Sequence, residues 1–217
     1  MTIVFKKILV LILFVQFFCQ ISTAEMVKAF DFTEAEFKNL KVKKIKGEIT
    51  WSLGFDGNGR FLKAESEGKA SVLGKEVLIN LLKTPFINIT WKVEKDLSGI
   101  VENSKEGHDY AARVFVIKKT GSTALSNRAI NYVFSSNNNV NDNWPSPYTK
   151  KSIDYVLSTT KEHLNEWITV KANVRKHFKQ FHDLDVKELS GIAVMTDTDN
   201  SKLKAISYYQ NIYFSSE

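Results

Sequence analysis

The sequence has very little cysteine and proline. Cys19 is the single cysteine among 217 residues, and there are only three prolines. One cysteine excludes a disulfide scaffold and cysteine-based metal sites. Neither a His-Glu-x-x-His motif nor a Gly-x-Ser-x-Gly motif occurs, so the usual zinc-hydrolase and serine-hydrolase signatures are missing. Any chemistry would therefore depend on carboxylates, arginines, amides and aromatic rings.

Long hydrophobic runs are also scarce, with one exception at the N-terminus. Two lysines at positions 6 and 7 precede an apolar stretch over residues 8–19, and Ser22-Thr23-Ala24 follows it. A basic head, a short apolar stretch and small residues at the end predict a secretory signal peptide, residues 1–24, cleaved after Ala24. The alternative is an uncleaved N-terminal anchor. The stretch is short for a bilayer span, so we expect a periplasmic or secreted protein with no stable membrane span after cleavage.

Charge of one sign is not concentrated anywhere. The full chain has a net charge of +6, which falls to +4 when Lys6 and Lys7 are removed with the signal. Basic residues are scattered over short runs such as residues 41–46. A nucleic-acid-binding surface needs denser positive charge. We therefore expect no nucleic-acid partner.

Alternation of apolar and polar residues dominates the remaining sequence. Residues 86–93 place Ile87, Ile89 and Trp91 on one face, which is typical of a half-buried strand. Similar alternation recurs in further segments, which are residues 47–51, 60–65, 71–80, 108–117, 129–134, 167–170, 191–196 and 206–214.

Turn and helix signals complete the fold prediction. Asp56-Gly57-Asn58-Gly59 predicts a tight hairpin, and residues 135–147 read as a long polar loop. Helical spacing is limited to residues 32–40 and 174–181. We predict an all-β fold, an antiparallel two-sheet jelly-roll-like sandwich with one or two short helices, as a single domain over residues 25–217.

Four separated motifs resemble a known family. In chain order they are Ile-Thr-Trp91-Lys-Val, Glu-Gly-His108-Asp109-Tyr-Ala-Ala-Arg113-Val-Phe-Val, Asn143-Trp144-Pro-Ser-Pro147-Tyr148-Thr and Gly191-Ile-Ala-Val-Met-Thr-Asp197-Thr-Asp199-Asn200. Together they resemble an uncharacterised bacterial family named only as domain of unknown function number 3047, over roughly residues 29 to 215. The resemblance implies an exported bacterial protein with a fold similar to carbohydrate-binding and lectin-like β-sandwiches. It implies no established activity and no site residues.

Two charged residues in the predicted strand 108–117 form the first candidate site. Strict alternation places Asp109 and Arg113 on the same face, opposite the more apolar one. They lie about 13 Å apart on an extended strand, so Arg113 needs a carboxylate from a neighbouring strand, for which Asp197 and Glu94 are candidates. Two interpretations stay open, a structural ion pair or a guanidinium clamp for a ligand's hydroxyls or carboxylate.

A polar run after the predicted strand 191–196 is the second candidate. It contains Asp197, Asp199 and Asn200. Closely spaced oxygen ligands suit Ca²⁺, so a calcium site at Asp197 and Asp199 is possible, and no other cofactor is expected. An ordinary Asx-rich turn and a sugar contact are the alternatives.

Aromatic residues are the third resource. Trp91 and Trp167 lie in predicted strands, so we expect both in the core. Trp144 and Tyr148 lie in the polar loop, where exposed aromatic rings are typical of recognition. These two are the first candidates for stacking on a sugar ring.

The sequence thus favours an exported, non-enzymatic protein that binds a glycan or another envelope component. Its expected ligand-binding residues are Asp109, Arg113, Trp144, Tyr148, Asp197, Asp199 and Asn200. One alternative is a carbohydrate-active hydrolase or lyase with Asp109 and Asp197 as acid and base. A second is a structural periplasmic protein. A binding protein or an enzyme requires these side chains to converge on one cleft. If they are scattered, the structural protein is favoured.

Overall fold

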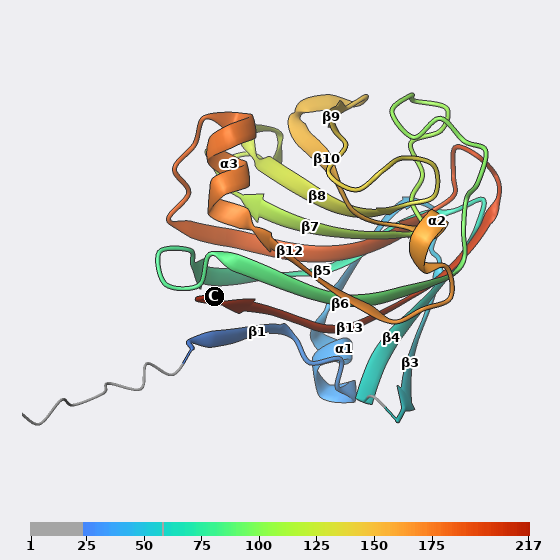
Figure 1. The fold of residues 1–217 in the computed structure, drawn as a ribbon, viewed down its shortest axis with the longest axis horizontal. Coiled ribbons are helices and arrows are strands. Elements are labelled where there is room, and N and C mark those ends of the chain that lie inside the picture. Colours follow the sequence, from blue (N-terminus) through green and yellow to red (C-terminus); the bar gives the residue numbers. More distant parts are fainter. Residues whose placement is uncertain (1–23, 58) are drawn as a thin grey trace, which may run out of the picture.

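Two β-sheets packed face to face make up the protein (Figure 1). The computed structural model describes residues 24–57 and 59–217, so the predicted signal peptide lies outside the described residues except for Ala24. The prediction of an all-β two-sheet sandwich is confirmed.

The lower layer in Figure 1 is sheet A. Its strands are β1 (Met26–Phe30), β3 (Thr50–Asp56), β4 (Gly59–Glu67), β6 (Phe86–Lys95), β11 (Ile168–Asn173) and β13 (Lys204–Ser215). The order is β11-β6-β13-β4-β3, and β1 also pairs with β13. All these pairs are antiparallel. Asp56 pairs with Gly59, so the predicted hairpin is confirmed.

The upper layer is sheet B. Its strands are β2 (Lys41–Lys46), β5 (Ala70–Asn80), β7 (Ala112–Lys118), β8 (Arg128–Ser135), β9 (Asn143–Ser146), β10 (Thr149–Thr159) and β12 (Glu188–Asp197). The order is β2-β5-β12-β7-β8-β10-β9. One pair differs from the antiparallel prediction, because β8 and β10 run parallel. The sequence pattern missed β1, β2, β9 and β10, and β9 lies within residues 135–147, which were predicted as a loop.

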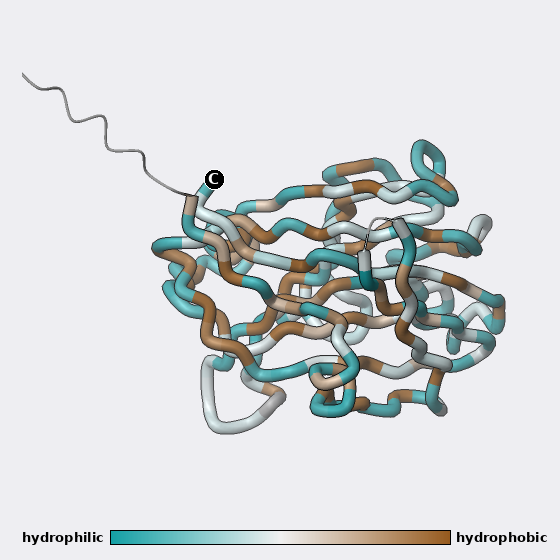
Figure 2. Tube along the Cα trace, turned by 90° about the horizontal axis from the view of Figure 1, so that it is seen from below, coloured by the Kyte–Doolittle hydropathy of each residue, from teal (hydrophilic) through white to brown (hydrophobic). Residues whose placement is uncertain are grey.

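The core lies between the two sheets and follows from the alternation. Trp91 of β6 is fully buried, as predicted, and packs on Phe134 of β8 with ring centroids 5.4 Å apart. Its indole N–H donates to the hydroxyl of Ser158 at 3.0 Å, so the buried polar atom is satisfied. In Figure 2 the tube alternates between hydrophilic and hydrophobic colours along many strands, as this arrangement requires.

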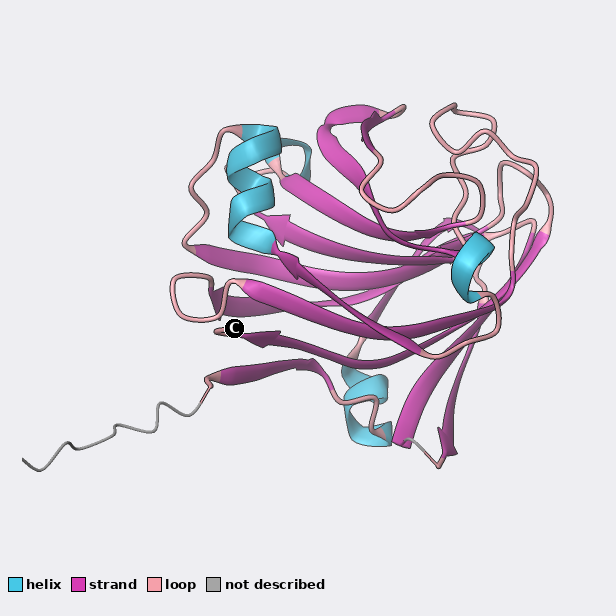
Figure 3. Cartoon of the chain, in the orientation of Figure 1, coloured by secondary structure: helices cyan, strands magenta, loops and turns pink. Residues whose placement is uncertain are grey.

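Three α-helices lie at the periphery of the described chain (Figure 3). They are α1 (Glu34–Asn39), α2 (Thr160–His163) and α3 (Val174–His182). Thr33 and Asn173 cap α1 and α3 by accepting hydrogen bonds from backbone N–H groups. Both predicted helices are present, and the one-turn helix α2 is additional. No helix within residues 24–57 and 59–217 has the length and apolarity needed to cross a membrane.

Candidate functional site

A split in sheet A creates a hollow on the surface of the protein. Strand β4 pairs with residues 204–209 of β13, and β1 pairs with residues 212–215. Gln210 and Asn211 lie between these two partners and pair with neither. The register with β6 also shifts here. Asn211 has a φ of 40°, a left-handed conformation that asparagine tolerates better than most residues.

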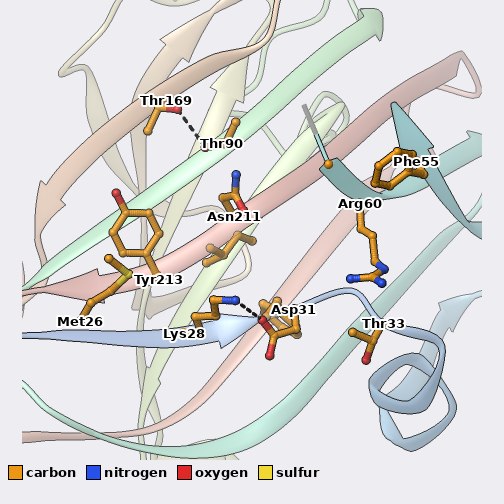
Figure 4. A pocket seen from close by; sticks show the side chains of 13 residues that line it. Met26, Lys28, Asp31, Thr33, Phe55, Arg60, Thr90, Thr169, Asn211 and Tyr213 are labelled. Atoms are coloured by element: carbon orange, nitrogen blue, oxygen red, sulfur yellow. Dashed lines mark hydrogen bonds and ion pairs between the residues drawn. The ribbon is translucent and has the colours of Figure 1, made fainter. Parts of the chain in front are cut away.

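The opening left by this split is named here the sheet hollow. It has a volume of about 510 Å³. Its walls are β1 with the start of α1 on one side and the β3–β4 hairpin on the other, and its floor is formed by β6, β11 and β13 (Figure 4). The lining residues are Met26, Lys28, Phe30, Asp31, Thr33, Phe55, Gly59, Arg60, Thr90, Thr169, Asn211, Ile212 and Tyr213.

The sheet hollow combines aromatic rings with hydrogen-bonding groups. Tyr213 and Phe55 supply the rings, and the side chain of Phe55 is 76% exposed. The hydroxyls of Thr90 and Thr169 lie 2.8 Å apart on the floor (Figure 4). Ligand sites typically join apolar surface to a few placed polar groups, and this hollow has that composition.

An aromatic cluster adjoins the sheet hollow. The rings of Phe61, Trp167 and Tyr208 come from three different segments, and their centroids lie 5.4–6.0 Å apart. Trp167 donates its indole N–H to Asp56 at 3.2 Å, which ties the hairpin to the start of β11. Trp167 is therefore half-buried in this cluster and not in the core, contrary to the prediction. Lys92 covers the ring of Tyr208 at 4.3 Å, so this ring face is already occupied.

The charged residues predicted as a site come together in a different place, above sheet B. Arg113 Nη2 donates to both carboxylate oxygens of Asp197 at 2.9 and 2.7 Å. The two side chains are each 4% exposed. The prediction that Arg113 pairs with a carboxylate from a neighbouring strand is confirmed for Asp197, whereas Glu94 accepts a hydrogen bond from Tyr208. Arg113 and Asp197 thus form a buried ion pair that joins β7 to β12.

Asp109 lies in the loop before β7, not on the strand. The N–H of Asp109 donates to the carbonyl of Gly107 at 2.8 Å, and this tight turn breaks the alternation expected from His108 onward. One carboxylate oxygen of Asp109 accepts hydrogen bonds from the backbone and side chain of Asn200, and the other accepts one from the N–H of Ser201. Asp109 therefore holds the loop after β12 in place.

A second buried aspartate supports the same region and was missed from the sequence. Asp154 on β10 accepts hydrogen bonds from His108 and Asn131, both at 2.7 Å. Burial raises the pKa of Asp154, but the bond from His108 and the charge of Arg113 outweigh this and hold its pKa below the ordinary value. Burial raises the pKa of Asp197 to about 7, although Arg113 opposes the shift. The chain itself supplies the partners of these carboxylates.

Asp109, Asp197 and Asp199 meet the geometric condition for a shared cation. One carboxylate oxygen from each lies within 4.8 Å of the others. Arg113 already neutralises Asp197, however, and backbone N–H groups already bind Asp109. These contacts leave fewer lone pairs for a calcium ion, which takes six to eight oxygen ligands. Calcium binding at this cluster stays a prediction.

Tyr148, Asp199 and Asn200 are the predicted residues that line an open surface. With three lysines and Glu106 they line a shallow hollow of about 370 Å³, named here the loop hollow, formed by Lys46, Lys105, Glu106, Tyr148, Asp199, Asn200 and Lys202. Tyr148 is 58% exposed, and its hydroxyl donates to Asn200 at 3.1 Å. Trp144 lies apart on β9, half-buried against Tyr110, Val133 and Val156.

The predicted residues therefore divide into buried and open sets. Asp109, Arg113 and Asp197 are buried, and Tyr148 with its neighbours is open. None of the seven lines the sheet hollow. A signal for that hollow exists in the sequence, because Gln210-Asn211 interrupts the alternation between residues 206 and 214. Such an interruption is typical of a β-bulge, and bulges are frequent next to functional sites.

Comparison with known protein families identifies one match. A family model described as "Protein of unknown function (DUF3047)" matches residues 35–213. No curated protein matches the sequence.

Several solved structures are similar to the chain. A family 30 carbohydrate-binding module of a cellulosomal cellulase of Clostridium thermocellum has a TM-score of 0.50 and 9% identity, covering 89% of this chain and 98% of the module. A cellulase derived from Rhodothermus marinus has a TM-score of 0.44 and 7% identity, covering 81% and 100%. The xyloglucanase domain of a Sinorhizobium fredii effector has a TM-score of 0.42 and 9% identity, covering 80% and 92%. At 9% identity the likeness to the carbohydrate-binding module shows a shared fold alone.

Proposed function

The chain belongs to the family described as protein of unknown function DUF3047, and from this premise we propose that it is an exported, non-enzymatic protein that binds a glycan in the sheet hollow. The observation that carries the proposal is the composition of that hollow. Tyr213 and Phe55 present aromatic surface, while Asn211, Thr90 and Thr169 present amide and hydroxyl groups from the floor. Export rests on the sequence pattern of residues 1–24.

A sugar ring suits this combination of groups. Its C–H faces are apolar and pack on aromatic rings, while its hydroxyls lie around the rim and need hydrogen-bond partners. A volume of about 510 Å³ falls in the usual range for ligand sites. The family 30 carbohydrate-binding module shares the fold. A shared fold is only an analogy for function, so the chemistry of the hollow carries the argument.

The burial of the candidate catalytic pair supports binding over hydrolysis. Asp109 is 0% exposed and Asp197 is 3% exposed. Glycosidases place two carboxylates on either side of a bound glycosidic bond. Here both carboxylates are engaged by backbone N–H groups, and Asp197 also by Arg113. A hydrolase or lyase mechanism through this pair would first have to break these contacts.

A binding and turnover panel tests the proposal. Residues 25–217 are titrated by calorimetry with neutral and acidic oligosaccharides, and each mixture is then assayed for new reducing ends and unsaturated products. We expect saturable binding to at least one glycan, with a dissociation constant on the order of 1 μM to 1 mM, and no product. Product formation that Asp197→Asn abolishes would support the hydrolase or lyase instead. Absence of binding to every glycan in the panel would contradict the proposal and favour the alternative of a structural periplasmic protein.

A further inference from the structure

We infer that the sheet hollow selects an acidic glycan, one whose sugar units carry a carboxylate group. The inference rests on the proposed function, since it names the ligand class for the same site. It follows from the charges and the unpaired donors around the hollow.

Arg60 gives the sheet hollow its net charge. Among the charged lining residues, Lys28 and Asp31 form an ion pair at 2.9 Å, so their charges offset each other. Arg60 at the start of β4 has no ion pair or hydrogen bond to any other described side chain, and its guanidinium extends toward Asp31 and Thr33 on the opposite wall (Figure 4). The hollow therefore holds one uncompensated positive charge.

The chemistry of this charge favours a carboxylate. A guanidinium group offers a planar fork of N–H donors that matches the two oxygens of a carboxylate. Elsewhere in this chain Arg175 already makes such a contact, with its Nε and Nη2 donating to the two oxygens of Asp185. The fork of Arg60 has no equivalent partner among the described residues. A ligand carboxylate would supply one.

A second unpaired donor lies close to Gly59, outside the lining of the hollow. Gln210 is 2% exposed, and its Nε2 atom is buried without a hydrogen-bond partner in the described chain. This atom lies 3.3 Å from the position that a Cβ atom would take at Gly59, which lines the hollow. Buried polar groups are normally paired. Arg60 is the unpaired donor that lines the hollow itself, and its guanidinium suits a ligand with acceptor oxygens.

Matched pairs of oligosaccharides test the inference. Mannotetraose and tetramannuronate share a backbone and differ only in the carboxylate at C6, and cellotetraose and tetraglucuronate form a second pair. We expect the uronate of at least one pair to bind about tenfold more tightly than its neutral partner. We also expect that preference to weaken as ionic strength rises.

Two variants test whether Arg60 causes the preference for the uronate. Arg60→Gln is expected to lower the ratio of uronate affinity to neutral affinity from about tenfold to about one. The control is Lys171→Gln. Lys171 lies on the floor strand β11 but does not line the hollow, so this variant removes a nearby positive charge and is expected to keep the preference for the uronate. Equal binding of both partners, or an unchanged preference in Arg60→Gln, would overturn the inference while the proposed function stands. Absence of binding to all four sugars and to the wider panel would reject the proposed function itself.

Discussion

Replacing Arg113 with methionine is expected to lower the free energy of unfolding by about 3–5 kcal/mol. Arg113 is the ion-pair partner of Asp197, and both side chains are 4% exposed. Removing the guanidinium leaves a buried carboxylate without its counter-charge, which is the costly way to break such a pair. Chemical denaturation of the wild type and the variant measures the difference.

A second arginine provides the control. Arg175 pairs with Asp185 through two N–H donors, but the two side chains are 39% and 49% exposed. Exposed pairs contribute little, so Arg175→Met is expected to cost less than about 1 kcal/mol. If the two variants lose similar stability, the claim that Arg113 and Asp197 form a structural pair is wrong.

The pH dependence of the Arg113→Met variant follows from Asp197. Burial already raises the pKa of Asp197 above the value of 3.8 expected in an unfolded chain, and losing Arg113 raises it further. A carboxyl with a raised pKa binds a proton in the folded state, so its contribution to stability decreases as pH rises. We therefore expect the stability lost in Arg113→Met to be smaller near about pH 5 than near about pH 8.

Replacing Tyr213 with alanine is expected to weaken glycan binding at least about tenfold. Tyr213 lines the sheet hollow, and its ring is the aromatic surface that comes from the floor strand β13. Loss of the ring removes apolar contact with the sugar face. Calorimetric titration with the tightest glycan of the panel measures the change.

The matched substitution is Tyr148→Ala. Tyr148 is 58% exposed and lines the loop hollow, the open surface that sequence patterns favour. We expect the Tyr148→Ala variant to bind the glycan with an affinity within about twofold of wild type. Both variants need an unchanged melting temperature for the comparison to hold. A tenfold loss in Tyr148→Ala with normal binding by Tyr213→Ala would move the site to the loop hollow.

Much of the fold could be predicted because alternation reports which strands face a core. Residues 86–93 and 206–214 lie in strands β6 and β13. Strand β10 was missed because it begins with three exposed residues, Thr149 to Lys151, which hide the alternation that follows. Its parallel pairing with β8 depends on contacts between distant segments, and local patterns do not encode these.

The candidate site was harder to predict, for two physical reasons. Alternation assigns faces only while the backbone stays extended, and the turn at Asp109 ends that condition. Alternation also does not say whether the outer face of a sheet is open or covered. Arg113 points away from the apolar core face, as predicted, but loop residues such as Tyr110 cover it, with the ring centroid 4.3 Å from the guanidinium carbon.

The sheet hollow depends on an event that a single strand cannot show. It arises because β13 changes partner from β4 to β1 along one edge. The local trace of this change is the pair Gln210-Asn211, with its shifted register and positive φ. The sequence contains this interruption, but the partners that make it an opening come from residues far away in the chain.

The most direct test of the account is to map the bound glycan by amide NMR. The assigned protein, residues 25–217, is titrated with its tightest glycan, and shift changes are recorded residue by residue. Binding in the sheet hollow predicts the largest changes at Thr90, Thr169 and Asn211, which form its floor. Changes confined to Lys105 and Asn200 of the loop hollow, with the floor residues unmoved at saturation, would contradict it.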